Sequence, residues 1–139
     1  MAQSISEVMT ADPRTVEATA TVADAAREMR EGDVGPVIVT EDGGVCGIVT
    51  DRDIAVRAVA EGKDPAVTPV GEICSRNPTT LTPDQSVEEA IQIMREQHVR
   101  RIPIVQDGRP AGIVAIGDLA VERDRESALA DISAAPPTH

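Results

Sequence analysis

The chain contains no phenylalanine, tyrosine or tryptophan among its 139 residues. Its hydrophobic core must therefore consist of Ile, Val, Leu, Met and Ala side chains. Without an aromatic ring the chain has no platform on which the bases of single-stranded nucleic acid can stack. The formal net charge of −11 also opposes sequence-independent binding to a phosphate backbone. We therefore expect no nucleic-acid partner.

Cysteine and long apolar runs are also scarce. Only Cys46 and Cys74 occur, and their spacing indicates neither a disulfide framework nor a zinc site. The longest apolar runs are a few residues, far short of the roughly 18 needed to span a bilayer. The sequence shows no metal-ligand cluster, Ser/Cys-His-acid set, Walker phosphate loop or dinucleotide fingerprint. We therefore expect a cytoplasmic protein with no membrane segment, metal site, cofactor or enzymatic activity.

What the sequence does contain is an internal repeat. A shift of 65 positions aligns residues 8–59 with the second half without a gap, and about a third of the positions are identical. Matched pairs include Pro13 with Pro78, Met29–Glu31 with Met94–Glu96, Gly47–Val49 with Gly112–Val114, and Asp53 with Asp118. A gapless match of this length indicates a tandem duplication. A single copy would bury too little surface to be stable, so we expect the two copies to pack together.

Both copies contain a helix with a recognisable start. Two capping boxes mark these starts, Thr21-x-x-Asp24 and Ser86-x-x-Glu89. Apolar residues follow each box at helical spacing on one face. We expect these helices to end near residues 32 and 97. A second helix is expected at the end of each copy, over residues 51–60 and 117–125.

The expected strands surround an Asp-Gly turn in each copy. Apolar runs at residues 37–39 and 102–105 indicate buried strands. The turn favours a hairpin, so the return strands are expected over residues 45–49 and 111–115. A short extended segment is also expected from residues 15 and 80, because each follows an X-Pro turn.

These elements predict an α+β fold of two βαββα repeats. The first repeat covers residues 8–60 and the second covers residues 72–125. Residues 61–71, which include two prolines, form the expected connector. Residues 126–139 show no periodic pattern and are expected to form a flexible tail.

The element order and four phrases of the sequence resemble a pair of CBS domains, also called a Bateman module. The phrases are VMTADPRTV, ICSRNPTTL, HVRRIPIV and the closing Gly-h-h-Thr-x-x-Asp, in which h is apolar. The resemblance covers about residues 8–125 and is to stand-alone pairs of the kind that includes hypoxic response proteins. It implies a pseudo-twofold pair with two clefts between the repeats, and a flat homodimer formed through helices. It also implies adenosine-containing ligands such as AMP, ADP, ATP or S-adenosylmethionine.

The resemblance implies an intact first cleft. The closing motif of the first repeat supplies Thr50, Arg52 and Asp53, in which the aspartate would hold the ribose hydroxyls and the threonine would contact ribose or phosphate. The opposite wall would come from the second repeat, from Thr79, Thr80, Leu81, Arg100, Arg101 and Ile102. A guanidinium group binds phosphate oxygens bidentately, so the arginine pair favours a phosphorylated ligand.

The second cleft departs from the family pattern. Asp118 remains, but Ala115 stands where the hydroxyl is expected. The opposite wall would come from Thr15, Val16, Gly35, Pro36 and Val37. This cleft keeps the ribose carboxylate and lacks phosphate contacts, so we expect it to be weakened.

Simpler interpretations remain beside these. Thr50 and Asp53 also fit an ordinary capping box. Arg100 and Arg101 also fit exposed charges, whose ion pairs contribute roughly 0–1 kcal/mol. A lone histidine such as His98 is more often a surface or capping residue than a ligand. The sequence favours an adenine-nucleotide sensor that acts through an effector protein. The alternative is a protein–protein interaction module that keeps the fold without the ligand.

Overall fold

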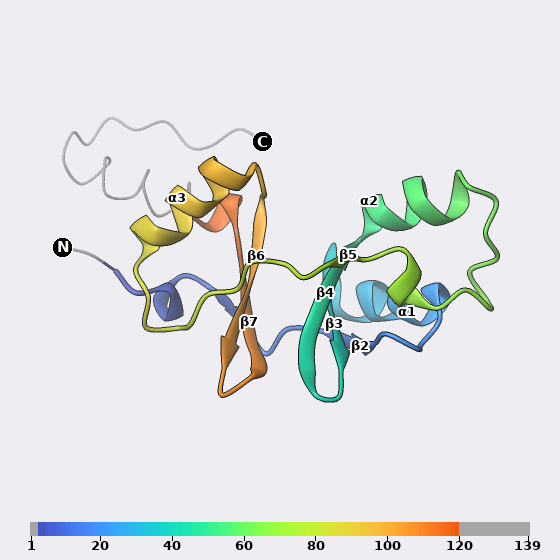
Figure 1. Ribbon diagram of the computed structural model, residues 1–139, viewed down its shortest axis with the longest axis horizontal. Coiled ribbons are helices and arrows are strands. Elements are labelled where there is room, and N and C mark those ends of the chain that lie inside the picture. The colour runs from blue at the N-terminus through green and yellow to red at the C-terminus, as the bar shows by residue number, and fades with distance from the viewer. Residues whose placement is uncertain (1–2, 120–139) are drawn as a thin grey trace.

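The computed structural model describes residues 3–119, and two β-hairpins lie side by side at its centre (Figure 1). The first repeat contributes β2 (Thr15–Glu17), α1 (Val22–Gly32), β3 (Pro36–Glu41), β4 (Gly44–Thr50), α2 (Asp51–Asp53) and the π-helical η2 (Ile54–Val59). The second repeat contributes α3 (Val87–Gln97), β6 (Arg101–Gln106) and β7 (Arg109–Ala115). Each repeat opens with a short helical piece and a short strand, η1 (Ile5–Glu7) and β1 (Thr10–Ala11) in the first and η3 (Val70–Glu72) and β5 (Ser75–Arg76) in the second. The expected α+β fold is confirmed.

The second helix differs from a regular α-helix in the first repeat and is described only at its start in the second. After α2 the chain continues through η2, where the Ala60 N–H donates to the Ala55 carbonyl at 3.0 Å, five residues back. In the second repeat, residues 116–119 are helical. The rest of the helix expected over 117–125, and the tail expected at 126–139, lie outside the described residues. Within the described range no helix is long and apolar enough to cross a membrane.

Capping boxes begin the two long helices, as the sequence predicts. In α1 the Asp24 N–H donates to Thr21 Oγ1 at 3.1 Å, and the Thr21 N–H donates to Asp24 Oδ2 at 3.0 Å. The same reciprocal pair opens α3 at Ser86. Both helices end near the expected residues, at Asp33 (φ 52°) and His98 (φ 57°), which take the left-handed conformation that stops a helix.

The hairpin turns also follow from the sequence. Asp42 and Gly43 have φ values of 54° and 81°, and the matching Asp107 and Gly108 have 54° and 79°. Two successive positive φ values are what a type I′ turn requires, and Asp-Gly is a favoured sequence for it. The hairpins therefore fold locally, with β3 antiparallel to β4 and β6 antiparallel to β7.

The two repeats exchange their opening strands, which the sequence did not predict. Strand β1 pairs with β7 of the second repeat, and β5 pairs with β4 of the first. The registers are equivalent, because the pairs Thr10↔Ile113 and Ser75↔Ile48 are related by the 65-residue shift. Each exchanged strand covers the free edge of the other repeat's hairpin, so neither edge is left unpaired there.

The cores follow the same exchange. Ile5 lies in the core of the second repeat, and Val70, Ile73 and Cys74 lie in the core of the first. The last two residues of the expected connector, Val70 and Gly71, are therefore buried rather than linking. A third cluster, made by isoleucines of β3, β4 and β7, joins the two halves: Ile38, Ile48 and Ile113.

The extended segment expected after Pro78 is a strand only in part. In the first repeat β2 pairs in parallel with β3, and the Ala18 N–H donates to the Thr40 carbonyl at 2.9 Å. In the second repeat only Leu81 forms a bridge to β6. Pro83 occupies the position equivalent to Ala18 and has no N–H to donate, so the pairing stops.

Candidate ligand-binding cleft between the repeats

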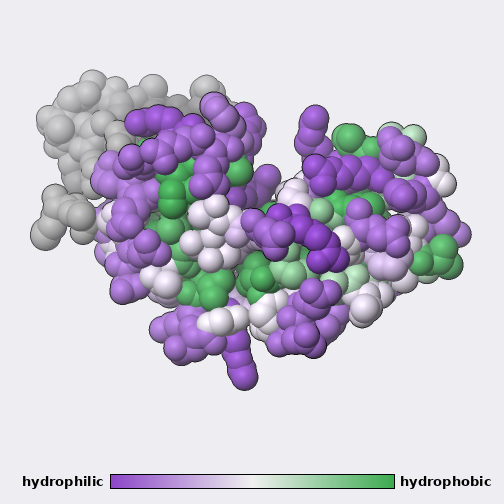
Figure 2. All heavy atoms as spheres, in the orientation of Figure 1, coloured by the Kyte–Doolittle hydropathy of each residue, from purple (hydrophilic) through white to green (hydrophobic). Residues whose placement is uncertain are grey.

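A cleft of about 520 Å³ lies where the two repeats meet. One wall is the end of β4 and the start of α2, and the other is β5 with the turn that follows it and the loop from α3 into β6. Figure 2 shows the surface notched between the two halves, on the side where Figure 1 places α2 and α3. Because strand exchange brings β5 onto β4, the cleft has walls from both repeats.

Six of the nine residues expected in the first cleft line it: Thr50, Arg52, Asp53, Thr79, Arg100 and Arg101. The other three do not. Thr80 is exposed beside the cleft, whereas Leu81 and Ile102 are 4% and 0% exposed in the core of the second repeat. Leu81 bridges to β6 and Ile102 lies within β6, so both side chains pack in that core rather than facing the cleft.

The structure adds lining residues that sequence reasoning missed: Ile48, Ser75, Arg76, Asn77, Pro78, Gln97, His98 and Val99. His98 is exposed and ends α3, as expected of a surface or capping residue, and it also lines the cleft. Ser75 and Arg76 belong to the exchanged strand β5, and they reach the cleft only because β5 pairs with β4. No local signal in the phrase SRNP shows this, because the pairing partner lies about 30 residues away in the other repeat.

Thr50 and Asp53 form a capping box at the cleft. The Asp53 N–H donates to Thr50 Oγ1 at 3.2 Å, and the Thr50 N–H donates to Asp53 Oδ2 at 2.9 Å. Asp53 Oδ1 lies 3.8 Å from Arg57 Nε, and its side chain is 16% exposed. The cap holds the carboxylate in one orientation, and lone pairs remain on both oxygens for a ligand.

Arginines give the cleft a positive charge in an acidic chain. Arg52, Arg76, Arg100 and Arg101 line it together with one carboxylate, Asp53. In the part of the chain that the structure describes, the side chains of Arg52, Arg100 and Arg101 make no hydrogen bond or ion pair. Arg76 is anchored, because its Nε donates to the Gly71 carbonyl at 3.1 Å. These groups are placed to bind an anion.

The rim of the cleft is tied to α3 by one side-chain hydrogen bond. Thr79 Oγ1 donates to Gln97 Oε1 at 2.6 Å, which links the turn after β5 to the end of α3. Both residues line the cleft. The second wall is therefore held together before any ligand arrives.

The family of the chain is decided by its sequence match. The family model for the CBS domain matches residues 5–59 and 70–124. The chain belongs to the CBS-domain family. It holds two such domains, and CBS pairs are regulatory modules that often bind adenosine-containing ligands.

Relatives of this CBS pair include proteins of similar length. The CBS domain-containing protein YhcV of Bacillus subtilis (strain 168) is 41% identical over 134 residues, which cover 94% of this chain and 95% of that protein. Hypoxic response protein 1 of Mycobacterium tuberculosis (strain H37Rv) is 34% identical over 115 residues, which cover 82% of this chain and 80% of that protein. The chain is thus similar to stand-alone CBS pairs.

Solved structures agree with this assignment. A crystal structure of hypoxic response protein I with two coordinated zinc ions has a TM-score of 0.76 and 32% identity, over 86% of this chain and 98% of that chain. A hexameric CBS-CP12 protein from bloom-forming cyanobacteria has a TM-score of 0.77 and 29% identity, over 96% of this chain and 90% of that chain. The described residues of this CBS pair place no group of three or more His, Cys, Asp or Glu side chains where they could hold a metal ion.

The place expected for the second cleft lacks the four arginines that line the first. Asp118 Oδ2 accepts the Ala115 N–H at 3.0 Å, so half of the capping box remains. Of the residues expected on the opposite wall, Val16 and Val37 are buried in the core of the first repeat. Thr15 is exposed on β2, and Gly35 and Pro36 precede and begin β3. Val16 and Val37, which were expected in this cleft, therefore lie in the core of the first repeat instead, as Leu81 and Ile102 lie in that of the second.

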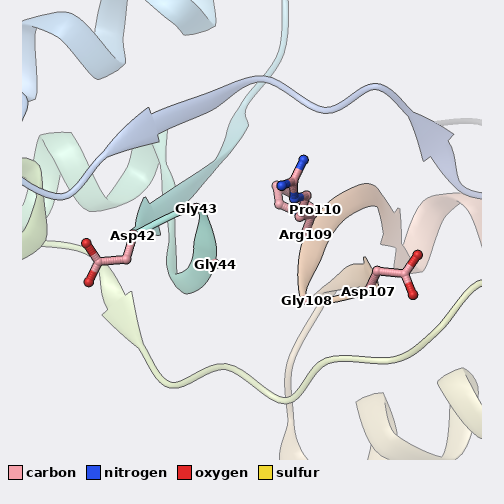
Figure 3. Close-up of a pocket in the computed structure, with 7 residues that line it drawn as sticks. All are labelled: Asp42, Gly43, Gly44, Asp107, Gly108, Arg109 and Pro110. Carbon is pink, nitrogen blue, oxygen red and sulfur yellow. The ribbon is translucent and has the colours of Figure 1, made fainter.

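A separate hollow of about 540 Å³ lies between the two hairpin turns. In Figure 3 the carboxylates of Asp42 and Asp107 point away from each other, with Arg109 and Pro110 between the turns. Carboxylates that point apart do not form a cation site. This hollow is a gap between two tight turns.

The two cysteines belong to the core of the first repeat. Cys74 is buried and Cys46 is half-buried against the same cluster. Burial raises the pKa of both thiols. A raised pKa leaves little thiolate at neutral pH, which fits structural rather than reactive cysteines.

Proposed function

We propose that this CBS pair is a regulatory protein that binds one adenine nucleotide per chain in the first cleft and acts through an effector protein. The observation that supports this most is that three arginine side chains without a partner among residues 3–119 line one cleft together with the Thr50–Asp53 cap. In this assignment Asp53 binds the ribose hydroxyls, and Arg52, Arg100 and Arg101 bind phosphate oxygens. The second cleft, without the hydroxyl and the arginines, stays empty of nucleotide.

The mechanism that we propose follows from the two-sided cleft. Asp53 belongs to the first repeat and Arg100 and Arg101 to the second, so a ligand that contacts all three bridges the repeats. A ligand shifts a conformational equilibrium only as far as it binds one arrangement more tightly than another. A bridging ligand favours the arrangement in which the two walls of the cleft are close enough for one nucleotide to contact both. The effector would recognise that arrangement.

We further propose that the protein works as a homodimer in the cytoplasm. The hexameric assembly of the CBS-CP12 neighbour supports self-association in this fold.

Equilibrium dialysis tests the nucleotide proposal directly. The chain has no Phe, Tyr or Trp, so the ultraviolet absorbance of the adenine ring is read without a protein background. AMP, ADP, ATP and S-adenosylmethionine would be dialysed against the wild type, Asp53→Ala and Asp118→Ala. We expect one site per chain, lost in Asp53→Ala and kept in Asp118→Ala.

The two variants control for folding. Each removes a carboxylate that accepts one backbone N–H at a cap, from Thr50 at 2.9 Å or from Ala115 at 3.0 Å. Their effects on stability should therefore be similar, and far-UV circular dichroism would confirm that both are folded. Absence of binding to folded wild type would refute the nucleotide proposal and favour the protein–protein interaction module.

A further inference from the structure

The pseudo-twofold symmetry shows whether the fold requires the arginines of the first cleft. Positions 65 residues apart hold equivalent places, as the registers Ser75↔Ile48 and Thr10↔Ile113 show. At the equivalent places Arg52, Arg76, Arg100 and Arg101 are replaced by Gly117, Ala11, Gly35 and Pro36. The second repeat interface forms without a cation at any of these places. Folding therefore does not require an arginine at these places, although Arg76 also donates to the Gly71 carbonyl.

The charge of the first cleft exceeds what a single phosphate group needs. Four arginines and one carboxylate give a formal excess of three positive charges, in a chain whose net charge is −11. A phosphate monoester carries at most about two negative charges. One guanidinium group already binds two of its oxygens. One or two arginines would therefore be enough for a monophosphate.

The arginines also come from separate elements. Arg52 lies at the start of α2, Arg76 on β5, and Arg100 and Arg101 where the chain enters β6. The cleft volume of about 520 Å³ is within the usual range for small-molecule sites. A chain of phosphates can extend from the cations on one element to those on the next, so a longer phosphate chain can use more of these arginines.

We propose that the first cleft selects a nucleotide with two or more phosphates, a nucleoside di- or triphosphate, over the monophosphate; this rests on the nucleotide-binding function proposed above. The ribose end is held at Asp53, and the phosphate chain runs toward Arg100 and Arg101. The selectivity resides in the arginines, because each added phosphate finds a guanidinium group that has no partner among the described residues.

Dialysis of adenosine, AMP, ADP and ATP in magnesium-free buffer tests this order. We expect ATP to bind at least tenfold more tightly than AMP, since a charge-assisted hydrogen bond contributes about a decade or more in affinity. Added salt should weaken ATP binding more than AMP binding. Arg100→Gln and Arg101→Gln should each lower the affinity for ATP more than that for AMP.

Arg109→Gln is the matched control. It removes the same charge at the hairpin turn, at the opposite end of β6 and β7 from the cleft. Affinity for AMP equal to or above that for ATP would overturn this inference and leave the nucleotide proposal standing. Equal loss of ATP affinity in Arg109→Gln and Arg100→Gln would also overturn it, because overall charge would then set the order. Failure of every ligand to bind folded protein would overturn both proposals.

Discussion

Replacing Gly47 with alanine should destabilise the protein by forcing the exchanged strand β5 away from β4. A Cβ atom at this position would stand 2.7 Å from the Ser75 carbonyl oxygen and 2.8 Å from Cys74 Sγ. Ordinary contacts of this kind begin near 3.4 Å, so the groups must separate by more than half an ångström. The Ser75 oxygen is backbone and cannot rotate away as a side chain would.

Overpacking of this kind costs about 1–3 kcal/mol. With a urea dependence of about 1–3 kcal/mol per molar for a small protein, the unfolding midpoint should fall by roughly 1 M. Urea unfolding followed by far-UV circular dichroism measures this, since the chain has no aromatic residue for fluorescence. Gly44→Ala is the control within the same strand, because its Cβ atom would make only an ordinary contact at 3.6 Å. Equal midpoints for Gly47→Ala and Gly44→Ala would refute the reasoning.

The same substitution should also alter ligand binding, because Ser75 and Arg76 line the first cleft. Gly112→Ala is the symmetric control, since its Cβ atom would stand 2.7 Å from the Thr10 carbonyl oxygen beside the second cleft. We expect a similar loss of stability in both variants and weaker nucleotide binding only in Gly47→Ala. Equal nucleotide affinities in the two would contradict a cleft wall formed by β5.

Two further predictions concern titratable groups. Hydrogen bonds from Thr21 lower the pKa of Asp24, and one from the Gln85 side chain is the largest cause that lowers the pKa of Glu89. Because the folded pKa is the lower one, this stabilisation is present above about pH 4 and is lost as the pH falls further. As the pH is lowered from about 6 to 3, the urea midpoint should fall less in Asp24→Asn than in the wild type. Equal falls would contradict a stabilising role for the ionised Asp24 carboxylate. The buried thiol of Cys74 should react with a thiol-specific disulfide reagent only after the protein is unfolded, so that two reactive thiols per chain are measured only in denaturant. Immediate reaction of both thiols in the folded protein would contradict the burial of Cys74.

Much of the fold could be predicted from the sequence because its signals are local. The capping box at Thr21, the Asp42-Gly43 turn and the apolar spacing of α1 each depend on residues within a few positions of one another. The tandem duplication repeats these signals, so the long helix and the hairpin were each predicted from two copies, whereas the short strands β1 and β5 were not predicted. The parallel pairing in the second repeat was the exception, since Pro83 removes one N–H from it.

The candidate site was predictable only in part. Thr50, Asp53 and the arginine pair line the cleft because the closing motif and the entry to β6 both face it. Leu81 and Ile102 do not line it, because they pack in the core of the second repeat, and only the tertiary packing shows where the chain passes from the cleft into that core. Whether the lining residues bind a nucleotide stays a prediction for dialysis to decide.

By itself the sequence determined the duplication, the starts and ends of the long helices, the hairpin turns and the CBS family, since these depend on local patterns repeated at a fixed shift. Only the tertiary structure decided that the repeats exchange their opening strands, and that Arg76 therefore lines the same cleft as Arg52. The physical reason is that an unpaired strand edge accepts any strand of suitable register, near or distant in the chain. The partner that it takes is set by packing across the whole molecule rather than by its neighbours in sequence.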